Sequence, residues 1–472
     1  MSQALLLAVD VGTSSARALI FTDDLTALPH TLTQAPYADG AEMSPSAVWE
    51  GVSACLDGAL ARLGADPRPM KALVMDTFAA SLLGTDATGE PLTPIYTWAD
   101  ARGGEIAARL RREHDAEGYT ERTGARLHTS YWPTRLLWLA ESGFPTGHVR
   151  HWLTVGEWLQ WRLTGTRHIS LSAAAWTGLL NRFEGAWDAE TCRWLPLTPD
   201  QLSPISDSPA DGLRPAWAAR WPRLANAAVF PAIGDGYASN LGSGCIGPDQ
   251  VALAIGTSGA LRLLVRGRPS PVPDGLFAYA VSPDQTLVGG ALSNAGNLYA
   301  WLNGILNRSD GLAGLESLPP DGHGLTVLPY LAGERAPLWD NDAFGAIVGL
   351  TLSTRPEQIV QAGLESVAYR YAALWERLRH LAGEEAGVVA SGGPTHSAPL
   401  WMQIIADAIG LPVATCAEPE ATIRGAAAYA LGVRSAPPVG RIFTPRPALT
   451  AVYAAGAARQ AALYRALRPA SP

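Results

Sequence analysis

A strand, a turn of small residues and a second strand occur twice in this sequence, half a chain apart. The first copy covers residues 5–21 and contains Gly12-Thr13-Ser14, and the second covers residues 251–265 and contains Gly256-Thr257-Ser258. Each pattern predicts a β-hairpin. Because the two triplets are 244 positions apart in a chain of 472 residues, we expect two domains of related architecture. The alternative is two unrelated hairpins that share a short match.

The segment between the two copies is rich in proline. Residues 196–231 contain seven prolines in 36 positions, a density typical of irregular chain rather than packed helices or strands. We place the domain boundary just after it, with an N-terminal domain over residues 1–244 and a C-terminal domain over residues 245–472.

Helix signals are clearest in the second half. Apolar residues from Val360 to Leu381 recur at alternating steps of four and three, which places them on one face of a helix. Thr354 and Glu357 have the spacing of a capping box at its start, and Gly383 is a stop signal.

Two further helices follow from similar signals. One is expected over about residues 398–409, between Ser397 as its N-cap and Gly410 as its C-cap, and another near residues 450–467. A strand is expected over residues 387–391. Strands that alternate with helices in both halves indicate the α/β class.

The basic residues exclude two ways of binding ATP. Only Lys71 among the 35 basic residues is a lysine, and no glycine-rich loop precedes it. A Walker A loop ends in a lysine, and protein kinases need a lysine on the strand after their glycine-rich loop. Any ATP chemistry in this chain must therefore use another phosphate-binding design.

Composition argues against nucleic acids and membranes as partners. The net charge is −8, and the sequence has no basic run. The apolar stretch from Ala4 to Val9 is too short for a membrane span and has no basic residue before it. The four cysteines form no Cys-x-x-Cys and fit free thiols in a reducing compartment. We expect a cytoplasmic protein.

The two Gly-Thr-Ser turns are candidates for phosphate binding. Glycine and small hydroxylated residues in a tight turn let backbone N–H groups and hydroxyls approach phosphate oxygens. Arg17 could add a charge-assisted contact, and Asp10, at the end of the first strand, could hold a Mg²⁺-bound water beside the phosphates. The alternative is an ordinary hairpin in which Asp10 caps a turn.

Three further segments carry candidate site residues. Asp235 stands between two glycines, where a carboxylate either accepts a proton from a substrate hydroxyl or forms a simple turn. Residues 391–397 join a strand to a helix N-terminus, which favours a phosphate or a flat ligand. Trp98, Asp100 and Arg102 suit either a polyhydroxy substrate or a packed indole beside a surface ion pair.

Together these motifs, in order from Leu5 to about Gly432, resemble the FGGY family of carbohydrate kinases. A segment from Gly345 to Glu365 is similar to the C-terminal signature of that family. The resemblance implies a two-domain actin/hexokinase-like (ribonuclease H-like) fold with a central interdomain cleft. It also implies ATP and Mg²⁺ as cofactors, a small sugar or sugar acid as the partner molecule, and nucleotide binding by the C-terminal domain.

The resemblance implies a role for each matched residue. Asp235 would be the general base for the primary hydroxyl of the substrate, and Asp10 would organise Mg²⁺. The residues implied to contact ATP are Gly12, Thr13, Ser14, Arg17, Gly256, Thr257, Gly296, Gly392, Gly393 and Ser397. The candidate substrate neighbours are Ser81, Trp98, Asp100, Arg102, Asn294 and Arg335.

Within the family, the chain is most similar to the gluconokinase branch, which implies phosphorylation of D-gluconate to 6-phosphogluconate. It departs from that branch at Phe78-Ala79-Ala80-Ser81, where a bulky residue and a sugar-contacting His usually precede the Ser. The alternatives are a xylulokinase-like or other polyol kinase and a non-catalytic sensor of sugar or nucleotide. A homodimer is an open alternative for the assembly.

Overall fold

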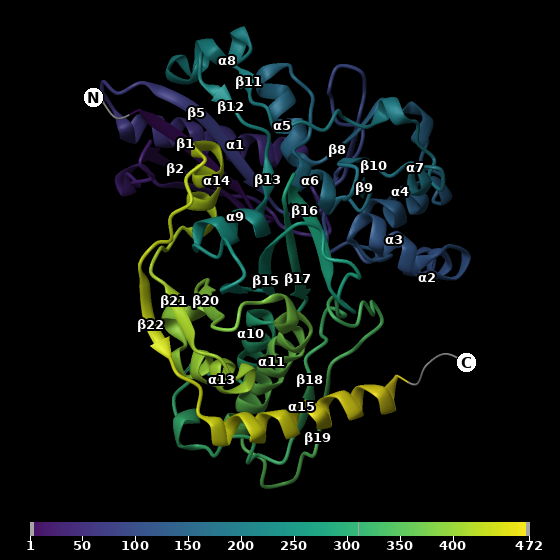
Figure 1. Cartoon of the computed structure of the whole chain (residues 1–472), viewed down its shortest axis with the longest axis vertical. Coiled ribbons are helices and arrows are strands. Elements are labelled where there is room, and N and C mark those ends of the chain that lie inside the picture. Colours follow the sequence, from purple (N-terminus) through teal and green to yellow (C-terminus); the bar gives the residue numbers. More distant parts are fainter. Residues whose placement is uncertain (1–3, 310, 469–472) are drawn as a thin grey trace.

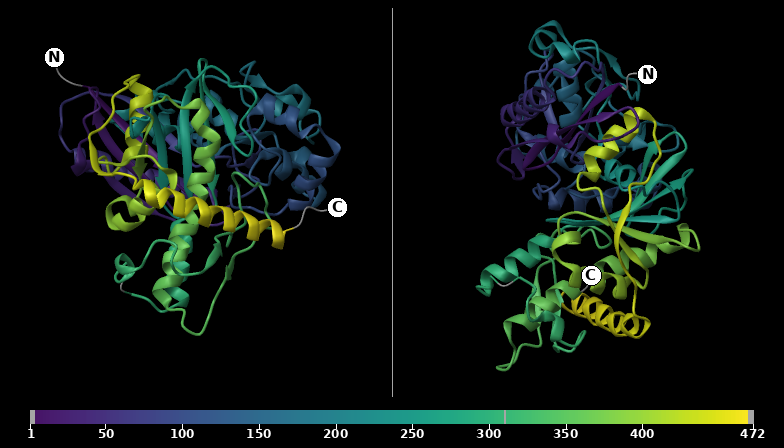
Figure 2. Two further views of the ribbon diagram at one scale, coloured as in Figure 1. Left: turned by 60° about the horizontal axis from the view of Figure 1, so that its bottom comes forward. Right: turned by 90° about the vertical axis from the view of Figure 1, so that its left-hand side faces the viewer.

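The computed structural model describes residues 4–309 and 311–468. It consists of two α/β halves, each built around a seven-stranded sheet (Figure 1). The N-terminal strands lie at one end of the molecule, and helix α15 (Pro447–Leu467) lies at the other (Figure 1, Figure 2). Among the described residues, no helix is long and apolar enough to cross a membrane.

The first sheet contains the predicted hairpin of β1 (Leu5–Val11) and β2 (Ser15–Thr22), which pair antiparallel. On its other side, β1 pairs in parallel with β5 (Met70–Thr77). The strand order is β11-β12-β5-β1-β2-β3, and β13 also pairs with β5. The remaining strands are β3 (Thr33–Pro36), β11 (Ala210–Asp211), β12 (Ala228–Val229) and β13 (Ile233–Gly234).

The second sheet repeats this arrangement. Its hairpin is β14 (Gln250–Ile255) with β15 (Gly259–Arg266), and β14 pairs in parallel with β20 (Gly387–Ser391). The order is β16-β17-β15-β14-β20-β21-β22. The recurrence of an antiparallel hairpin beside a parallel strand confirms that the two halves have related architecture. The remaining strands are β16 (Phe277–Ser282), β17 (Gln285–Leu292), β21 (Val413–Cys416) and β22 (Val439–Phe443).

The chain also forms helices, some of which pack against the two sheets. In the first half they are α1 (Pro45–Leu63), α2 (Gly104–Glu113), α3 (Ala116–Thr123), α4 (Trp132–Glu141), α5 (Val155–Thr164), α6 (Leu171–Trp176), α7 (Ala189–Cys192), α8 (Pro215–Arg220) and α9 (Asp235–Gly242). After β14 they are α10 (Gly296–Ile305), α11 (Pro356–Leu378), α12 (Pro394–Ser397), α13 (Pro399–Ile409) and α14 (Ala421–Leu431). Short strand pairs outside the sheets are β4 (Glu42–Met43) with β7 (Ile95–Tyr96), β6 (Leu83–Thr85) with β8 (His151–Leu153), β9 (Leu180–Asn181) with β10 (Ala186–Trp187), and β18 (Thr326–Leu328) with β19 (Ala346–Val348).

Alternate residues of the first sheet enter different cores. Leu7 of β1 and Leu73 of β5 lie in the core that contains α1 and α5. Leu6 and Val74 lie in a separate core with the small residues of α14. Because side chains alternate along a strand, Asp10 points to the same face as Leu6, the face that α14 covers.

The long predicted helix is α11, but its N-cap is one residue later than the predicted N-cap, Thr354. The backbone N–H of Arg355 donates to Oε1 of Gln358 at 2.9 Å, so Arg355 is the N-cap. The hydroxyl of Thr354 instead accepts from the N–H of Thr351 at 2.9 Å. Glu357 pairs with Arg308 at 2.6 Å, and the predicted Thr354–Glu357 box is therefore wrong.

The second predicted helix is α13, and here one predicted cap is correct. Gly410 ends the helix in the left-handed conformation, with a φ of 77° that glycine adopts without strain. The predicted N-cap is wrong, because Ser397 belongs to the preceding short helix and its hydroxyl donates to the carbonyl of Gly393 at 3.2 Å. The third predicted helix is α15, and the strand over residues 387–391 is β20.

Helices α9 and α14 cross between the two halves in backbone contact (Figure 1). A Cβ atom at Gly242 would collide with the carbonyl oxygen of Ala421, and one at Gly425 would collide with that of Ala238. The helices can approach this closely because no side chain stands between them. Helix α14 comes late in the sequence but packs against the sheet of the first half.

Candidate active site

Three carboxylates meet at one edge of the first sheet. Asp10 is in register with Asp76 on the neighbouring parallel strand, and β13, which pairs with β5 beside Asp76, leads directly into Asp235. The carboxyl ends of parallel strands share one edge of a sheet, which is where ligands bind in open α/β folds. The topology thus brings together residues that are more than 60 and more than 150 positions apart.

The two glycines around Asp235 make room for bulky neighbours. A Cβ at Gly234 would overlap the ring of Trp176, and a Cβ at Gly236 would lie 2.9 Å from Nε of Arg262. The N–H of Gly236 donates to Oδ1 of Asp235 at 2.6 Å. Burial raises the pKa of Asp235, and the positive charge of Arg262 opposes that rise. The two glycines therefore let the indole of Trp176 and the guanidinium group of Arg262 pack against the backbone on either side of Asp235.

Arg17, one of the residues implied to contact ATP, forms two ion pairs that link the two halves of the chain. One nitrogen of its guanidinium group donates to Asp10, and another donates to Glu420 at 2.8 Å. Glu420 directly precedes α14. The Gly-Thr-Ser turn nearby is tight, with the N–H of Gly12 donating to the carbonyl of Ser15 at 3.0 Å. Thr13 is half-buried and Ser14 is exposed.

A small cavity of about 130 Å³ lies between the halves, beside Asp235. Arg262 and Arg335 are part of its wall, and Arg335 stacks over the ring of Trp98 with 4.3 Å between the guanidinium carbon and the ring centroid. Most of the remaining wall is aromatic or small. The lining residues are Ala79, Ala80, Trp98, Ser130, Tyr131, Trp176, Asp235, Ala254, Ser258, Gly259, Ala260, Arg262, Phe277, Tyr279, Ala291, Arg335 and Trp339.

Two of the six predicted substrate neighbours, Trp98 and Arg335, line this cavity. The other four hold the surrounding structure. The hydroxyl of Ser81 accepts from the N–H of Val155 at 3.0 Å, and Nδ2 of Asn294 donates to the carbonyl of Gly333 at 3.0 Å.

Asp100 and Arg102 form an ion pair outside the lining of the cavity. Nε of Arg102 lies 2.8 Å from Oδ1 of Asp100, and the guanidinium group also stacks on Trp138 at 4.2 Å. The guanidinium group of Arg102 also forms an ion pair with Glu42. In this arrangement the pair fixes the loop that carries Trp98.

A second cavity, of about 610 Å³, lies next to the second Gly-Thr-Ser turn. It brings together five of the residues implied to contact ATP. They are Gly256, Thr257, Gly296, Gly393 and Ser397. The other lining residues are Asn297, Tyr299, Ala300, Leu312, Pro394, Ala398 and Trp401.

Glycines let backbone segments approach each other around this second cavity. A Cβ at Gly296 would lie 2.5 Å from the carbonyl oxygen of Gly256, and one at Gly392 would collide with the carbonyl of Ile255. Gly392 also has a φ of 110°, a backbone conformation that residues other than glycine rarely adopt. Such a bare backbone rim with one aromatic wall suits a planar ring and its attached phosphates.

Sequence reasoning missed several residues of the site. Asp76 ends an apolar strand in the same way as Asp10, and that signal was available in the sequence. Arg262 lies on a strand whose alternation shows only that it shares a face with Ala260 and Leu264. The aromatic wall from Tyr131, Trp176, Tyr279 and Trp339 assembles from distant segments, so local patterns cannot reveal it.

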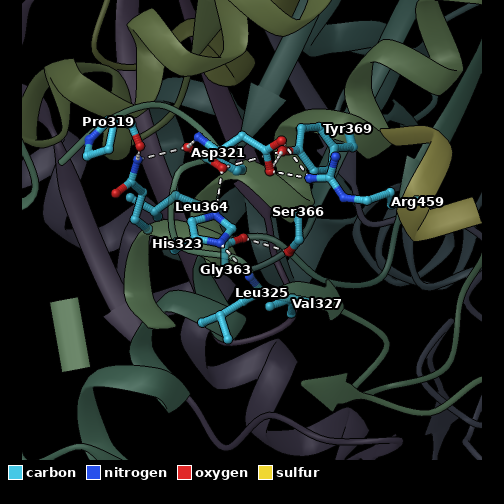
Figure 3. A network of polar contacts seen from close by, with 12 residues as sticks. Pro319, Asp321, His323, Leu325, Val327, Gly363, Leu364, Ser366, Tyr369 and Arg459 are labelled. Carbon is cyan, nitrogen blue, oxygen red and sulfur yellow. Dashed lines mark hydrogen bonds and ion pairs between the residues drawn. The ribbon is translucent and has the colours of Figure 1, made fainter. Parts of the chain in front are cut away.

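A group of acidic residues and a histidine elsewhere has the composition of a metal site but is already paired. His323 accepts from the N–H of Leu325 at Nδ1 (2.9 Å), so its Nε2 carries the proton that faces Glu365 at 2.9 Å (Figure 3). Arg459 of α15 pairs with Asp321 at 2.5 Å. These contacts tie α15 to α11 and give Glu365, the last residue of the signature-like segment, a structural role.

Comparison with known proteins places both halves in one family. The family description "FGGY family of carbohydrate kinases, N-terminal domain" matches residues 5–242, and the corresponding C-terminal domain matches residues 251–432. Together the two matches cover most of the chain.

Relatives with assigned activities belong to more than one kind of kinase. A gluconokinase of Bacillus subtilis (strain 168) is 28% identical over 434 residues, covering 85% of this chain and 82% of the relative. A glycerol kinase of Alkalilimnicola ehrlichii is 30% identical over 476 residues, covering 93% and 94%.

Solved structures show the same fold along almost the whole chain. A gluconate kinase from Lactobacillus acidophilus superimposes with a TM-score of 0.90 at 23% identity, and a ligand-bound xylulose kinase from the same organism does so with 0.90 at 24% identity. Each comparison covers 99% of both chains. The two-domain kinase fold implied by the motifs is confirmed.

Proposed function

Because the chain belongs to the FGGY family of carbohydrate kinases, we propose that it transfers the γ-phosphoryl group of ATP to a primary hydroxyl of a small sugar acid. D-Gluconate is the substrate we favour, with 6-phosphogluconate as the product. The family membership supports the transfer itself. The choice of an acid rests on the cavity beside Asp235.

The observation that carries this choice is the pair of arginines in the wall of that cavity. Nη1 of Arg262 and Nε of Arg335 are buried and have no hydrogen-bond partner among residues 4–309 and 311–468. Buried donors without partners are costly, and charged donors especially so. A carboxylate is the acceptor that guanidinium groups match best. A neutral ketose could satisfy these donors only with hydroxyl or carbonyl oxygens, which form weaker hydrogen bonds to guanidinium groups than a carboxylate does.

Asp235 is suited to remove the proton of the attacking hydroxyl. Its carboxylate borders the cavity, and its pKa is raised by burial, which strengthens it as a base. The hydroxyl oxygen forms the new bond to the γ-phosphorus, the bond from phosphorus to the bridging oxygen breaks, and ADP leaves. The proton goes to Asp235. Positioning and charge stabilisation supply most of the remaining acceleration.

The second cavity is where we place the nucleotide. The glycines of its rim keep side chains away from the backbone, and Trp401 and Tyr299 offer aromatic faces for a base. The carboxylate of Asp10, at the edge of the first sheet, fits a divalent cation, because Mg²⁺ prefers carboxylate and water oxygens. Asp10 would hold the ion together with its waters. When bound, Mg²⁺ neutralises charge that develops on the transferred phosphoryl group.

A second candidate substrate class is favoured by one feature of the cavity. Ala79 and Ala80 stand in its wall where the gluconokinase branch carries a bulky residue and His. Their small side chains leave space and remove one hydrogen-bond partner. A xylulokinase-like activity on a ketose or polyol would be consistent with such a wall.

ADP release coupled to a spectrophotometric reporter tests both candidates. The purified protein would receive Mg²⁺-ATP with gluconate, other sugar acids, ketoses and polyols including glycerol, with Asp235→Ala as control. We expect gluconate to give the highest kcat/KM. A ketose or polyol as the best substrate would overturn the choice of an acid, and stimulation by no sugar would overturn catalysis itself.

A further inference from the structure

Asp76 is a buried carboxylate that the proposed reaction does not use. It lies at the end of β5, directly beside Asp10 of β1, and its side chain points to the same face of the sheet. The same strand pairs with β13 next to Asp76, which brings Asp235 close. The relative exposure of Asp76 is 0%.

Within the part of the chain that the structure describes, the carboxylate of Asp76 has no hydrogen-bond donor to pair with. Neither of its oxygens accepts a hydrogen bond from any residue within 4–309 or 311–468. Asp10 is an acceptor as well when ionised, so the two groups can bond only by sharing a proton. The positive charge of Arg17 acts on Asp76, but its donors serve Asp10 and Glu420.

With this geometry, the buried carboxylate of Asp76 can be stabilised either by a proton shared with Asp10 or by a bound cation. Like charges side by side on neighbouring strands are destabilising, and buried carboxylates that are not hydrogen-bonded occur mainly where they meet an ion. A divalent cation between Asp10 and Asp76 would offset both charges at once. Carboxylate oxygens on adjacent parallel strands can contribute ligands to one ion.

We propose that Asp76 is a second carboxylate of the cation site at this sheet edge, where it binds the divalent ion together with Asp10, directly or through a water. Asp76 is then a positioning residue, which holds the ion beside the phosphates, while Asp235 accepts the proton of the attacking hydroxyl. The proposal rests on the proposed use of Mg²⁺ with ATP.

Binding of Mn²⁺, used as a spectroscopic substitute for Mg²⁺, tests this directly. The electron paramagnetic resonance signal of free Mn²⁺ would be followed during titration of the full-length protein, with and without ADP. Asp76→Asn keeps the shape of the side chain and removes the charge. Asp76→Ser is the second variant, in case the amide disturbs folding. Glu334→Gln is the matched control, because Glu334 is equally buried with an unpartnered oxygen but lies in the other half.

The expected result is a dissociation constant for Mn²⁺ at least tenfold higher in both Asp76 variants, and unchanged in Glu334→Gln. The thermal stabilisation that Mg²⁺ gives the wild-type protein should shrink in the same variants. Affinity for ADP in the presence of EDTA should stay the same. Wild-type Mn²⁺ affinity in both Asp76 variants would overturn the proposal and leave Asp76 as a protonated partner of Asp10.

The test does not depend on which sugar is phosphorylated. If no sugar stimulates ADP release but Mn²⁺ binding still requires Asp76, the proposed reaction fails and the cation site stands. If gluconate is phosphorylated and Mn²⁺ binding ignores Asp76, the cation site fails and the reaction stands.

Discussion

At the scale of single residues, the assignment of Asp235 as the base predicts a specific defect. Asp235→Asn should lower kcat by about 10²–10⁴-fold, because the amide cannot accept the proton of the attacking hydroxyl. The KM values for sugar and ATP should change little. Steady-state kinetics with gluconate and ATP would measure both.

The matched control for this substitution is Asp188→Asn. Asp188 is also buried, but it caps α7 and pairs with Arg122, so its loss should affect stability rather than turnover. A thermal melt would show that Asp235→Asn is folded. Near-normal turnover of a folded Asp235→Asn protein would mean that another group takes the proton.

Arg335 gives a second prediction, about the charge of the substrate. Arg335→Gln should lower kcat/KM for gluconate by about 10–100-fold, since a hydrogen bond to a charged group contributes about 1.5–3 kcal/mol. Activity on a neutral polyol of the same length should be unchanged or higher. Equal losses for the acid and the polyol would show that Arg335 acts through the packing of Trp98 and not through a carboxylate.

The residues of the candidate site can be proposed from the sequence where they stand in one continuous motif. Asp10, Asp235 and the two Gly-Thr-Ser turns stand in the sequence next to the glycines that shape them. Ser81, Asp100, Arg102 and Asn294 also belong to motifs, yet they bond to neighbouring backbone or to each other instead of lining the cavity. Sequence shows that such a residue is near the site, but not which way its side chain turns.

At the scale of elements, the spacing of apolar residues predicted where helices and strands lie, but the capping signals did not fix the first residues of the helices. The face of α11 follows from apolar spacing, because burial decides it. Its N-cap does not, because the hydroxyl of Thr354 accepts from the N–H of Thr351 in the preceding turn, and Gln358 accepts from the N–H of Arg355. The packing of α14 against the first sheet joins segments far apart in the sequence, and no local sequence pattern predicts it.

The crossing of α9 and α14 predicts the effect of adding one methyl group. In Gly425→Ala the new Cβ would collide with the carbonyl of Ala238 and push the helices apart. We expect a loss of about 1–3 kcal/mol of unfolding free energy, as for other overpacked sites, together with a lower kcat, because α9 begins at Asp235.

Gly304→Ala is the matched helical control for that change. No atom lies within 4 Å of a Cβ built at Gly304, so alanine should be neutral or slightly stabilising in α10. Denaturant titration and steady-state kinetics on both variants would measure the two effects. Wild-type stability and turnover in Gly425→Ala would show that the crossing has room to adjust.

At the scale of the whole molecule, two buried glutamates link stability to pH. Burial raises the pKa of Glu157 to about 7 and that of Glu334 to about 7, from an ordinary value of 4.5. The folded protein therefore holds protons that the unfolded chain releases between pH 4.5 and 7. Stability should fall as pH rises through this range, and the full cost should persist above pH 7.

Glu157→Gln should remove half of this pH dependence. The glutamine oxygen can still accept the N–H of Thr154, as Oε2 of Glu157 does at 2.6 Å, so the capping of α5 survives while the buried charge disappears. At pH 8 the variant should be more stable than wild type by up to about 3 kcal/mol, and at pH 4.5 the difference should vanish. Urea titrations at pH 4.5, 6 and 8 would measure it, with the exposed Glu50→Gln as a control that should follow wild type at every pH. A constant difference across the three pH values would mean that Glu157 titrates normally and that its surroundings admit water.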